Sequence, residues 1–474
     1  MSRAAAGLIA LDCGFLVTGL AVLWALGFVG GARDAVRHAP LALVTGWVTT
    51  ALLATLVLLV GPMPTASETV ALWGLALGAA ALGLLRRRPP DEPVPAPPPR
   101  ETSRAGATVA AAGALVVAAV VAADCRRALA SGPLSPDVVT EWLPKAETLF
   151  YFGRIDSRPG GFLSFSFEDY PPLAYVSDGL SFRFMGRADP LLIPTQHWVL
   201  AAAFYLSVAV LLSSRVRAAL VWPGVALLAV LPRMDVLVGS ALADEPLTEL
   251  FALTAICLVL WMLGGVRRYA WLAVLLGAGV VLVKAEGSML MLTLALAPAA
   301  WALRRRRLRD ALLPLSPLLA AAAWRVWLAV HHVRRTGPDY RLVDFFHPGY
   351  LASRTGRLEY AARELADATF SPKHSLLLAA ATLALAPLLA FHRRAIAVLL
   401  VSVVVVPTLV YLGIYWIGFD EIHLYLDGTK ERLTAPIDAA GAVLLPLLVT
   451  EAWRSWGAGA GLHSARWRSR ASAS

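Results

Sequence analysis

The chain has 474 residues, of which 58% are hydrophobic and only 16% charged, and its mean hydropathy is +0.66. Soluble domains usually carry about 25% charged residues, so this composition excludes an ordinary soluble protein, and it is far too apolar for a disordered chain. The net charge of +10 does not indicate nucleic-acid binding, because the basic residues cluster between apolar segments, as in the cytoplasmic loops of membrane proteins. The three cysteines fit no zinc or disulfide pattern. The sequence therefore predicts an all-α polytopic membrane protein.

Apolar runs predict the helices in chain order. A bilayer core of about 30 Å requires about 20 apolar residues in one helix. The runs predict about thirteen membrane-spanning helices, at residues 6–32, 40–61, 68–85, 107–124, 192–213, 217–232, 247–264, 269–283, 288–303, 311–330, 376–391, 394–416 and 433–453. Seven prolines predict an extended polar linker at residues 86–106. This linker separates residues 1–85, whose three helices either contact a partner or extend the bundle, from a larger domain at residues 107–453.

The charges between the spans predict the orientation of the chain, because cytoplasmic loops are enriched in lysine and arginine. The predicted cytoplasmic segments are residues 33–39, 86–106, 214–217, 265–268, 304–310, 392–394 and the basic tail 454–474. The predicted outer segments are residues 125–191, 233–246, 331–375 and 417–432. Two of these, 125–191 and 331–375, are far longer than ordinary connections, and such loops are often functional. The chain is expected in the plasma membrane, with its N-terminus outside.

The first outer loop contains a helix predicted to begin at Ser135. Apolar positions within residues 142–150 share one face, so this helix is predicted to lie along the outer membrane surface. Asp137, in its first turn, is interpreted equally well as a helix cap or as a reactive carboxylate. Glu141 and Lys145 are four residues apart, which is typical of a surface ion pair.

Two further carboxylates, Glu168 and Asp169, precede Tyr170 and a pair of prolines in the same loop. Two acidic groups outside the membrane can bind a divalent cation or activate a hydroxyl group. A solvated turn is the simpler interpretation of this segment on its own.

Charged residues also occur at the edges of predicted spans. Asp244 precedes one span, Lys284 and Glu286 lie between two others, and Arg325 lies within an apolar run. Ionisable groups at membrane depth are costly and usually face a cavity, although a long arginine can also extend to the interface. All of these residues fall near the predicted outer side. Transfer from an anionic, lipid-linked donor needs this mixture, because cations bind the phosphate and a carboxylate deprotonates the acceptor.

A series of short segments follows in a fixed order along residues 107–453. They are Asp137 with Trp142, Lys145-Ala146, Leu149, Gly153 and Ile155; Asp169-Tyr170-Pro171-Pro172-Leu173; Ala243-Asp244-Glu245-Pro246-Leu247; Lys284-Ala285-Glu286-Gly287; Ala323-Trp324-Arg325; Thr336-Gly337-Pro338-Asp339-Tyr340; and Thr429-Lys430-Glu431-Arg432-Leu433. In this order and spacing they resemble the GT-C glycosyltransferases, in the branch with protein-O-mannosyltransferase-like and lipopolysaccharide-core-transferase-like membrane enzymes. The sequence departs from the pattern at Phe167, where a histidine often stands, and by two extra residues around 423–429.

The resemblance implies a GT-C-like helical bundle and an enzyme that takes a sugar from a polyprenyl-phosphate donor, usually with inversion. It implies that Asp137 is the catalytic base and that Lys284, Arg325 and Arg432 bind the phosphate. The remaining residues implied at the substrate site are Lys145, Glu168, Asp169, Tyr170, Asp244 and Glu286. No cofactor is certain, although some relatives need a divalent cation, to which Glu168 or Asp169 would contribute. The acceptor would be a glycan, lipid or protein of the cell envelope.

Two other functions are compatible with the sequence. A polytopic transporter or flippase of a lipid-linked precursor would also contain buried charges, but transporters usually place them near the bilayer midplane in paired repeats. Here the charges lie near one side and no repeat is recognisable. A scaffold that keeps the fold without activity is the third possibility, and the presence of Asp137 with several cations argues against it. His331, His332 and His423 are interpreted as structural.

Overall fold

The computed structural model describes residues 2–85, 103–132, 135–333, 341–390, 393–419 and 421–471. Helices make up 82% of the described residues, which contain no strand. Nine of the described helices are long and apolar enough to cross a membrane. The prediction of an all-α, multi-pass membrane protein is therefore confirmed. Most of the predicted proline-rich linker and the segment 334–340 lie outside the described residues.

The nine helices match nine of the predicted spans. They are α1 (Arg3–Leu26), α2 (Ala32–Val60), α3 (Ala66–Leu85), α4 (Arg104–Ser131), α7 (Ile193–Leu212), α10 (Asp244–Gly264), α12 (Glu286–Arg304), α19 (Arg394–Ile417) and α20 (Ile422–Ala471). The other four predicted spans hold helices of 12 to 17 residues, namely α8 (Ala218–Ala229), α11 (Arg267–Val283), α14 (Leu318–Val330) and α18 (Leu378–Ala390). These are shorter than the roughly 20 residues that a span requires, so the count of thirteen is not confirmed.

Several predicted boundaries are wrong. The predicted connection 33–39 lies inside α2, and most of the connection 417–432 lies inside α20, because these helices continue beyond their apolar stretches. The predicted span 217–232 ends early, and a short helix α9 (Pro232–Leu237) follows it. The span 311–330 is divided into α13 (Leu308–Leu312) and α14, with Pro314 and Pro317 in the break. Proline lacks the N–H that a helix interior requires.

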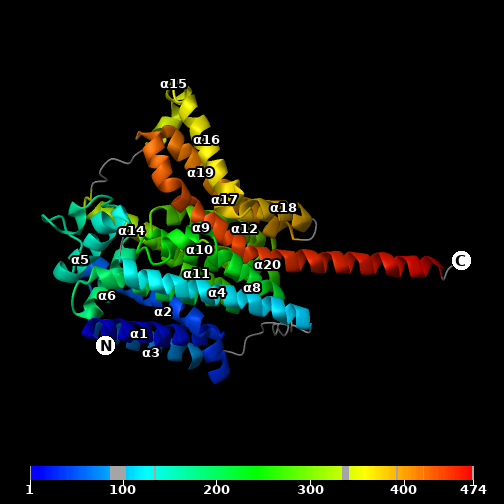
Figure 1. The fold of residues 1–474 in the computed structure, drawn as a ribbon, viewed down its shortest axis with the longest axis horizontal. Helices are drawn as coiled ribbons and strands as arrows, with labels where there is room; N and C mark the ends of the chain where they lie inside the picture. Colours follow the sequence, from blue (N-terminus) through cyan, green and yellow to red (C-terminus); the bar gives the residue numbers. More distant parts are fainter. Residues whose placement is uncertain are drawn as a thin grey trace.

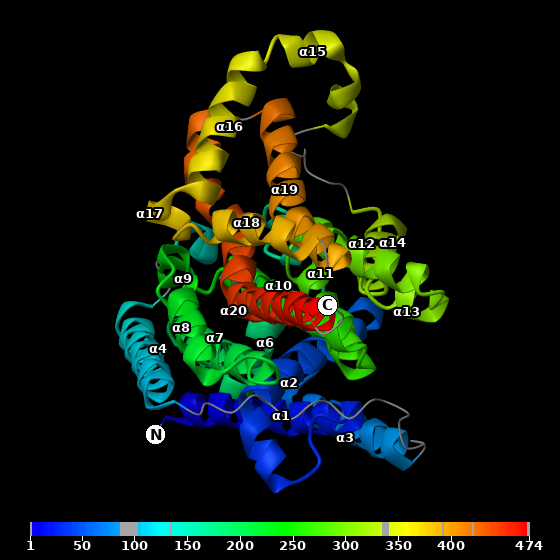
Figure 2. The same cartoon turned by 90° about the vertical axis from the view of Figure 1, so that its right-hand side faces the viewer.

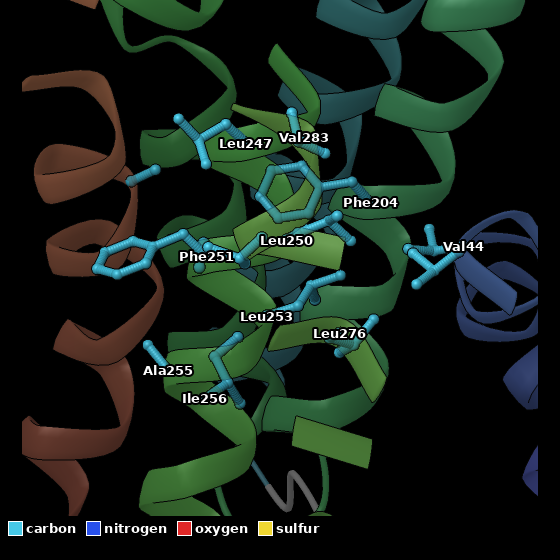
Figure 3. Packing of buried hydrophobic residues seen from close by; sticks show 14 of the residues in the cluster. Val44, Phe204, Leu247, Leu250, Phe251, Leu253, Ala255, Ile256, Leu276 and Val283 are labelled. Atoms are coloured by element: carbon cyan, nitrogen blue, oxygen red, sulfur yellow. The ribbon is translucent and has the colours of Figure 1, made fainter. Parts of the chain in front are cut away.

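Helix α10 forms the centre of the bundle. All of its residues from Asp244 to Met262 are buried, which is expected of a helix that is apolar on every face. Around Leu250 and Leu253, side chains from other helices complete the packing, among them Val44 of α2 and Phe204 of α7 (Figure 3).

The three N-terminal helices extend this bundle rather than forming a core of their own. Helices α1 and α2 touch backbone to backbone: a Cβ on Gly19 would lie 1.7 Å from the Ala42 carbonyl oxygen, and one on Gly46 would lie 1.7 Å from that of Phe15. Only glycine permits such an approach, which is a common way for membrane helices to pack. At the next residue of α2, the Trp47 indole donates a hydrogen bond to the Ser177 hydroxyl at 2.7 Å.

Two groups of shorter elements interrupt the spans. The first comprises the π-helical turn η1 (Val138–Trp142), α5 (Leu143–Phe152), η2 (Phe162–Ser164), α6 (Leu173–Met185) and η3 (Pro190–Leu192). The second comprises η4 (Leu342–Phe346), α15 (Pro348–Ala352), α16 (Thr355–Phe370) and α17 (Pro372–Ser375). Figures 1 and 2 show α15, α16 and α19 projecting from the rest of the bundle. A small core of its own, containing Leu365, Tyr411, Tyr415 and Leu426, stabilises this projection.

The helix predicted at Ser135 is present as η1 and α5, but its predicted surface position is wrong. Trp142, Ala146 and Leu149 are all buried in the main core of the protein. The apolar face therefore packs against the other helices and is not available to contact lipid.

The arginine-rich connections gather at one end of the bundle. Arg215 is paired with Glu451 at 3.4 Å, and the Arg454 guanidinium donates to the Arg215 carbonyl at 3.0 Å. At the start of α11, Arg268 donates to the carbonyl of Gly27, and Arg267 is paired with Asp310 at 2.9 Å. The acidic residues at the starts of α10 and α12, Asp244 and Glu286, lie at the opposite ends of those two helices from the arginine-rich connections that follow them.

Candidate active site

A polar cavity lies between the first of these two groups of shorter elements and the starts of α12 and α20. The described residues that line it are Asp137, Glu141, Trp142, Phe167, Tyr170, Lys284, Glu286, Tyr425, Thr429, Arg432 and Leu433. They come from four segments that are far apart in the sequence. The cavity volume of about 90 Å³ is small beside the roughly 300–1,000 Å³ of typical ligand pockets.

Asp137 directly precedes the π-helical turn η1, and its side chain bonds to Arg432 rather than capping the helix. The capping interpretation is therefore wrong in this structure. The π-helical turn follows directly, and such turns are frequent at functional sites. The Asp137 side chain is 49% exposed, so one face of the carboxylate is accessible from solvent.

Asp244 lies behind the cavity and holds its two cations together. Its side chain is 1% exposed. One carboxylate oxygen accepts from Arg432 Nε at 3.1 Å and Nη2 at 2.7 Å, and the other accepts from Lys284 Nζ at 2.8 Å. Asp244 is also the first residue of α10, where the helix dipole favours a negative charge. A buried carboxylate with two cationic partners fixes the positions of both cations.

Lys284 and Glu286 are placed by a sharp break between α11 and α12. Lys284 has an extended backbone that ends α11, and its Nζ lies 3.5 Å from the Glu286 carboxylate. Three residues after Lys284, α12 crosses α11 so closely that a Cβ on Gly287 would lie 1.9 Å from the Val280 carbonyl oxygen. This geometry explains why glycine ends the Lys-Ala-Glu-Gly segment: it allows the close crossing of the two helices, and the crossing directs Lys284 into the cavity.

Aromatic rings form one wall of the cavity. Trp142 stacks on Tyr175 with ring centroids 4.8 Å apart and planes at 16°, and Tyr170 packs against Phe167 at 4.8 Å. On the opposite side, Thr429 is bonded to the Tyr415 hydroxyl. Flat aromatic faces beside charged groups are suited to the apolar faces and hydroxyl groups of a sugar.

Lys145 does not line the cavity, and its prediction as half of a surface ion pair is wrong. The side chain is fully buried, and Nζ donates to the carbonyl oxygens of Ser166 at 2.6 Å and Phe167 at 2.9 Å. Its distance to Glu141 is 3.9 Å. Phe167 has φ of 55°, which is unfavourable for a bulky residue. The lysine thus holds a strained turn that carries part of the cavity wall.

This environment makes Lys145 sensitive to pH. Burial lowers the pKa of Lys145 from 10.5 to about 8, an effect opposed by attraction from Glu141. Between these two values the unfolded chain binds more protons than the folded chain, so stability rises with pH in this window. We expect the unfolding temperature of the native chain to increase relative to that of Lys145→Met between about pH 7.5 and about pH 10. Thermal unfolding of both proteins in detergent measures this, and a difference that is constant with pH contradicts it.

Asp169 and Arg325 form a separate pair outside the cavity lining. Arg325 Nη1 lies 3.1 Å from Asp169 Oδ2, and the indole of Trp324 donates to the Asp169 carbonyl at 2.9 Å. The Arg325 side chain is 50% exposed, so it is not the buried charge that its apolar neighbours predict. Glu168, which is partly buried, raises the pKa of Lys145 by its negative charge. The structure therefore does not bring Arg325 together with Lys284 and Arg432.

Some polar residues near the site were not predicted from the sequence. His197 of α7 is buried between Asp178 at 3.2 Å and Glu245 at 3.1 Å. Glu249, one turn further along α10, is buried with one carboxylate oxygen that has no hydrogen-bond partner. An ionisable residue in an apolar run is the signal that identifies His197 and Glu249. The sequence around Glu141 and Tyr425 does not indicate that they line a cavity, because only the folding of the chain brings them there.

The arrangement of the described residues gives no evidence for a metal site. No group of three or more His, Cys, Asp or Glu side chains in the described part of the chain is arranged to hold a metal ion. His331 stacks on Trp327 with centroids 4.0 Å apart and is bonded to the Trp327 carbonyl. The divalent cation that the family resemblance allows stays an untested prediction.

Comparison with known proteins adds no assignment. No family model, no curated protein and no solved structure matches the chain.

Proposed function

We propose that this chain is a membrane glycosyltransferase that moves a sugar from a polyprenyl-phosphate donor to a hydroxyl group of a cell-envelope glycan, lipid or protein, on the extracytoplasmic face. One observation carries the proposal: Asp137, Lys284 and Arg432 converge on one cavity from distant segments. The family resemblance implies the base and the phosphate ligands at these positions. The nine apolar helices are consistent with a lipid-linked donor.

The reaction balances with these residues. Asp137 accepts the proton of the acceptor hydroxyl, whose oxygen forms a bond to the anomeric carbon of the sugar. The bond between this carbon and the phosphate oxygen breaks, and its electron pair leaves with the polyprenyl phosphate. Lys284 and Arg432 stabilise the negative charge that develops on the phosphate, as preorganised cations do in many transferases. Attack opposite the leaving group inverts the anomeric centre.

The Asp137–Arg432 bond suggests how the donor prepares the base. The bond from Arg432 occupies the Asp137 carboxylate. Arginine also binds phosphate with two parallel hydrogen bonds. The donor phosphate therefore replaces Asp137 at Arg432, and the released carboxylate is free to accept the hydrogen bond of the acceptor hydroxyl. Asp244 keeps both cations in place during this exchange, since its own bonds to them are buried.

The test uses purified protein in lipid with a panel of radiolabelled polyprenyl-phosphate sugars and an envelope extract as acceptor. We expect release of free polyprenyl phosphate together with labelled acceptor from at least one donor. Movement of intact donor across the vesicle membrane without release would support a transporter or flippase instead. Absence of both reactions with every donor would overturn the enzymatic proposal and favour a scaffold.

Because Lys284 lines the cavity and Arg325 does not, we expect their replacement to lower transfer to different extents. Lys284→Gln should lower transfer by roughly 10- to 150-fold, because a hydrogen bond to a charged group contributes about 1.5–3 kcal/mol. Arg325→Gln should change transfer only slightly, because its side chain is half exposed and bound to Asp169 outside the cavity. Initial rates at saturating and at low donor concentration measure both effects. An Arg325 variant as impaired as the Lys284 variant would show that the phosphate binds elsewhere.

A further inference from the structure

A second cavity lies at the opposite end of α12 from the candidate active site. Its volume is about 440 Å³, and it is formed by the end of α12, the start of α19 and Met262 of α10. Helix α12 has 19 residues, so at about 1.5 Å per residue the two cavities are separated by about 28 Å. This is close to the thickness of a bilayer core. The second cavity therefore lies at the other membrane interface.

Four arginines line this cavity. Arg304 and Arg305 come from the end of α12, and Arg393 and Arg394 come from the start of α19. No carboxylate is among the described lining residues. Glu451 comes within 4.0 Å of Arg393, but it also pairs with Arg454 at 2.7 Å and with Arg215 at 3.4 Å. One carboxylate thus serves several cations, and the cavity keeps an excess of positive charge.

Two further features favour an anion at this place. The Arg305 guanidinium lies 4.6 Å above the Trp301 ring, which packs edge-on against Trp261 at 5.1 Å, so a rigid aromatic surface holds one of the cations. The cavity also includes the first residues of α19, a helix of 24 residues. The N-terminal end of a helix presents free N–H groups and a positive dipole to an anion.

The rest of the lining is apolar. It consists of Met262, Ala297, Ala300, Ala395, Ile396 and Val398. Ala300 and Val398 are exposed, so this surface continues toward the lipid-facing sides of α12 and α19. A cavity with cations at its mouth and an apolar wall along two membrane helices is complementary to a molecule with a phosphate and hydrocarbon chains. Basic pockets between membrane helices bind lipid headgroups in this way.

We propose that this arginine cavity is a binding site for a phosphate group, and that the phosphate belongs to an anionic phospholipid whose acyl chains lie along α12 and α19. The guanidinium groups of Arg304, Arg305 and Arg394 bind the phosphate oxygens, because their planar forks match this geometry. The inference is independent of the proposed transfer reaction, since the two sites lie at opposite ends of the bundle.

The experiment measures equilibrium binding of radiolabelled phosphatidylglycerol to the purified full chain in zwitterionic detergent. Phosphatidylcholine and inorganic phosphate serve as competitors. We expect saturable binding that excess phosphatidylglycerol displaces and that neither competitor displaces at the same concentration. The double variant Arg305→Gln with Arg394→Gln should weaken binding at least about tenfold, because each charge-assisted hydrogen bond contributes about that factor or more.

Two other variants separate the contributions. Arg33→Gln with Arg37→Gln removes the same charge from exposed positions of α2 outside the cavity and should leave binding unchanged. Ala300→Trp keeps all four arginines and fills the apolar wall, so it should block the lipid. Equal losses in both arginine double variants, or unchanged binding in the Arg305 and Arg394 variant, would overturn the site. Displacement by inorganic phosphate as effective as by phosphatidylglycerol would overturn the lipid assignment and indicate a water-soluble phosphate. Unfolding temperatures confirm that each variant is folded.

Discussion

Replacing Asp137 by asparagine should lower sugar transfer by roughly 10²- to 10⁴-fold, the usual contribution of a positioned general base. Asparagine has almost the same shape, and its amide oxygen can still accept the bond from Arg432. The variant should therefore fold like the native chain and bind the donor, but it cannot accept the proton of the acceptor. Release of polyprenyl phosphate from the labelled donor measures the loss, and donor binding measured separately should change little.

The matched control is Asp235→Asn. Asp235 lies on α9, outside the cavity, and its exposed carboxylate is paired with Arg127 at 2.7 Å. This change also removes one negative charge, so it reports any general effect of charge on the membrane-bound reaction. We expect native activity from it. Native activity in the Asp137 variant as well would show that the base lies elsewhere, and Asp169 would be examined next.

The fold was largely accessible from the sequence because its main signal is simple. Long apolar runs predict helices such as α10 and α19 directly, since length and hydropathy are sufficient in a membrane. The ends of helices were less accessible. Helix α20 begins with polar residues, and nothing in the residues around Ile422 marks the change from connection to helix. The interior break near Pro317 was missed because the apolar run continues through it.

The candidate site was accessible only where a charge lies in an unusual place. Asp244 and Lys284 stand out because ionisable residues at the edge of an apolar run need partners. Their mutual pairing and the bond from Arg432 could not be predicted, since these depend on how α10, α11 and α20 pack. Lys145 illustrates the opposite case. Its spacing from Glu141 is typical of a surface pair, but tertiary packing buries it and gives it carbonyl partners instead.

The second large effect is expected from Asp244→Asn, which should lower both stability and transfer. The carboxylate is buried and serves two cations, Arg432 and Lys284. A neutral amide cannot balance the positive charges of these two residues, and breaking a buried ion pair lowers the stability of the folded chain by about 3–5 kcal/mol. The cations also lose their fixed positions, and a displacement of about 1 Å at a reacting centre can reduce the rate by about 10²-fold. Chemical unfolding in detergent measures the first effect, and transfer per folded molecule measures the second.

Asp438→Asn is the control that separates these two effects. Asp438 of α20 is also fully buried and is bonded to Arg233 of α9, away from the residues that line the candidate site. Its loss should destabilise the chain to a similar extent, because one buried cation again loses its charged partner. Transfer per folded molecule should remain near the native value. If Asp244→Asn also leaves this quantity near the native value, activity follows stability alone and Asp244 does not position the cations. If Asp244→Asn leaves stability unchanged, the two cations do not depend on the buried carboxylate.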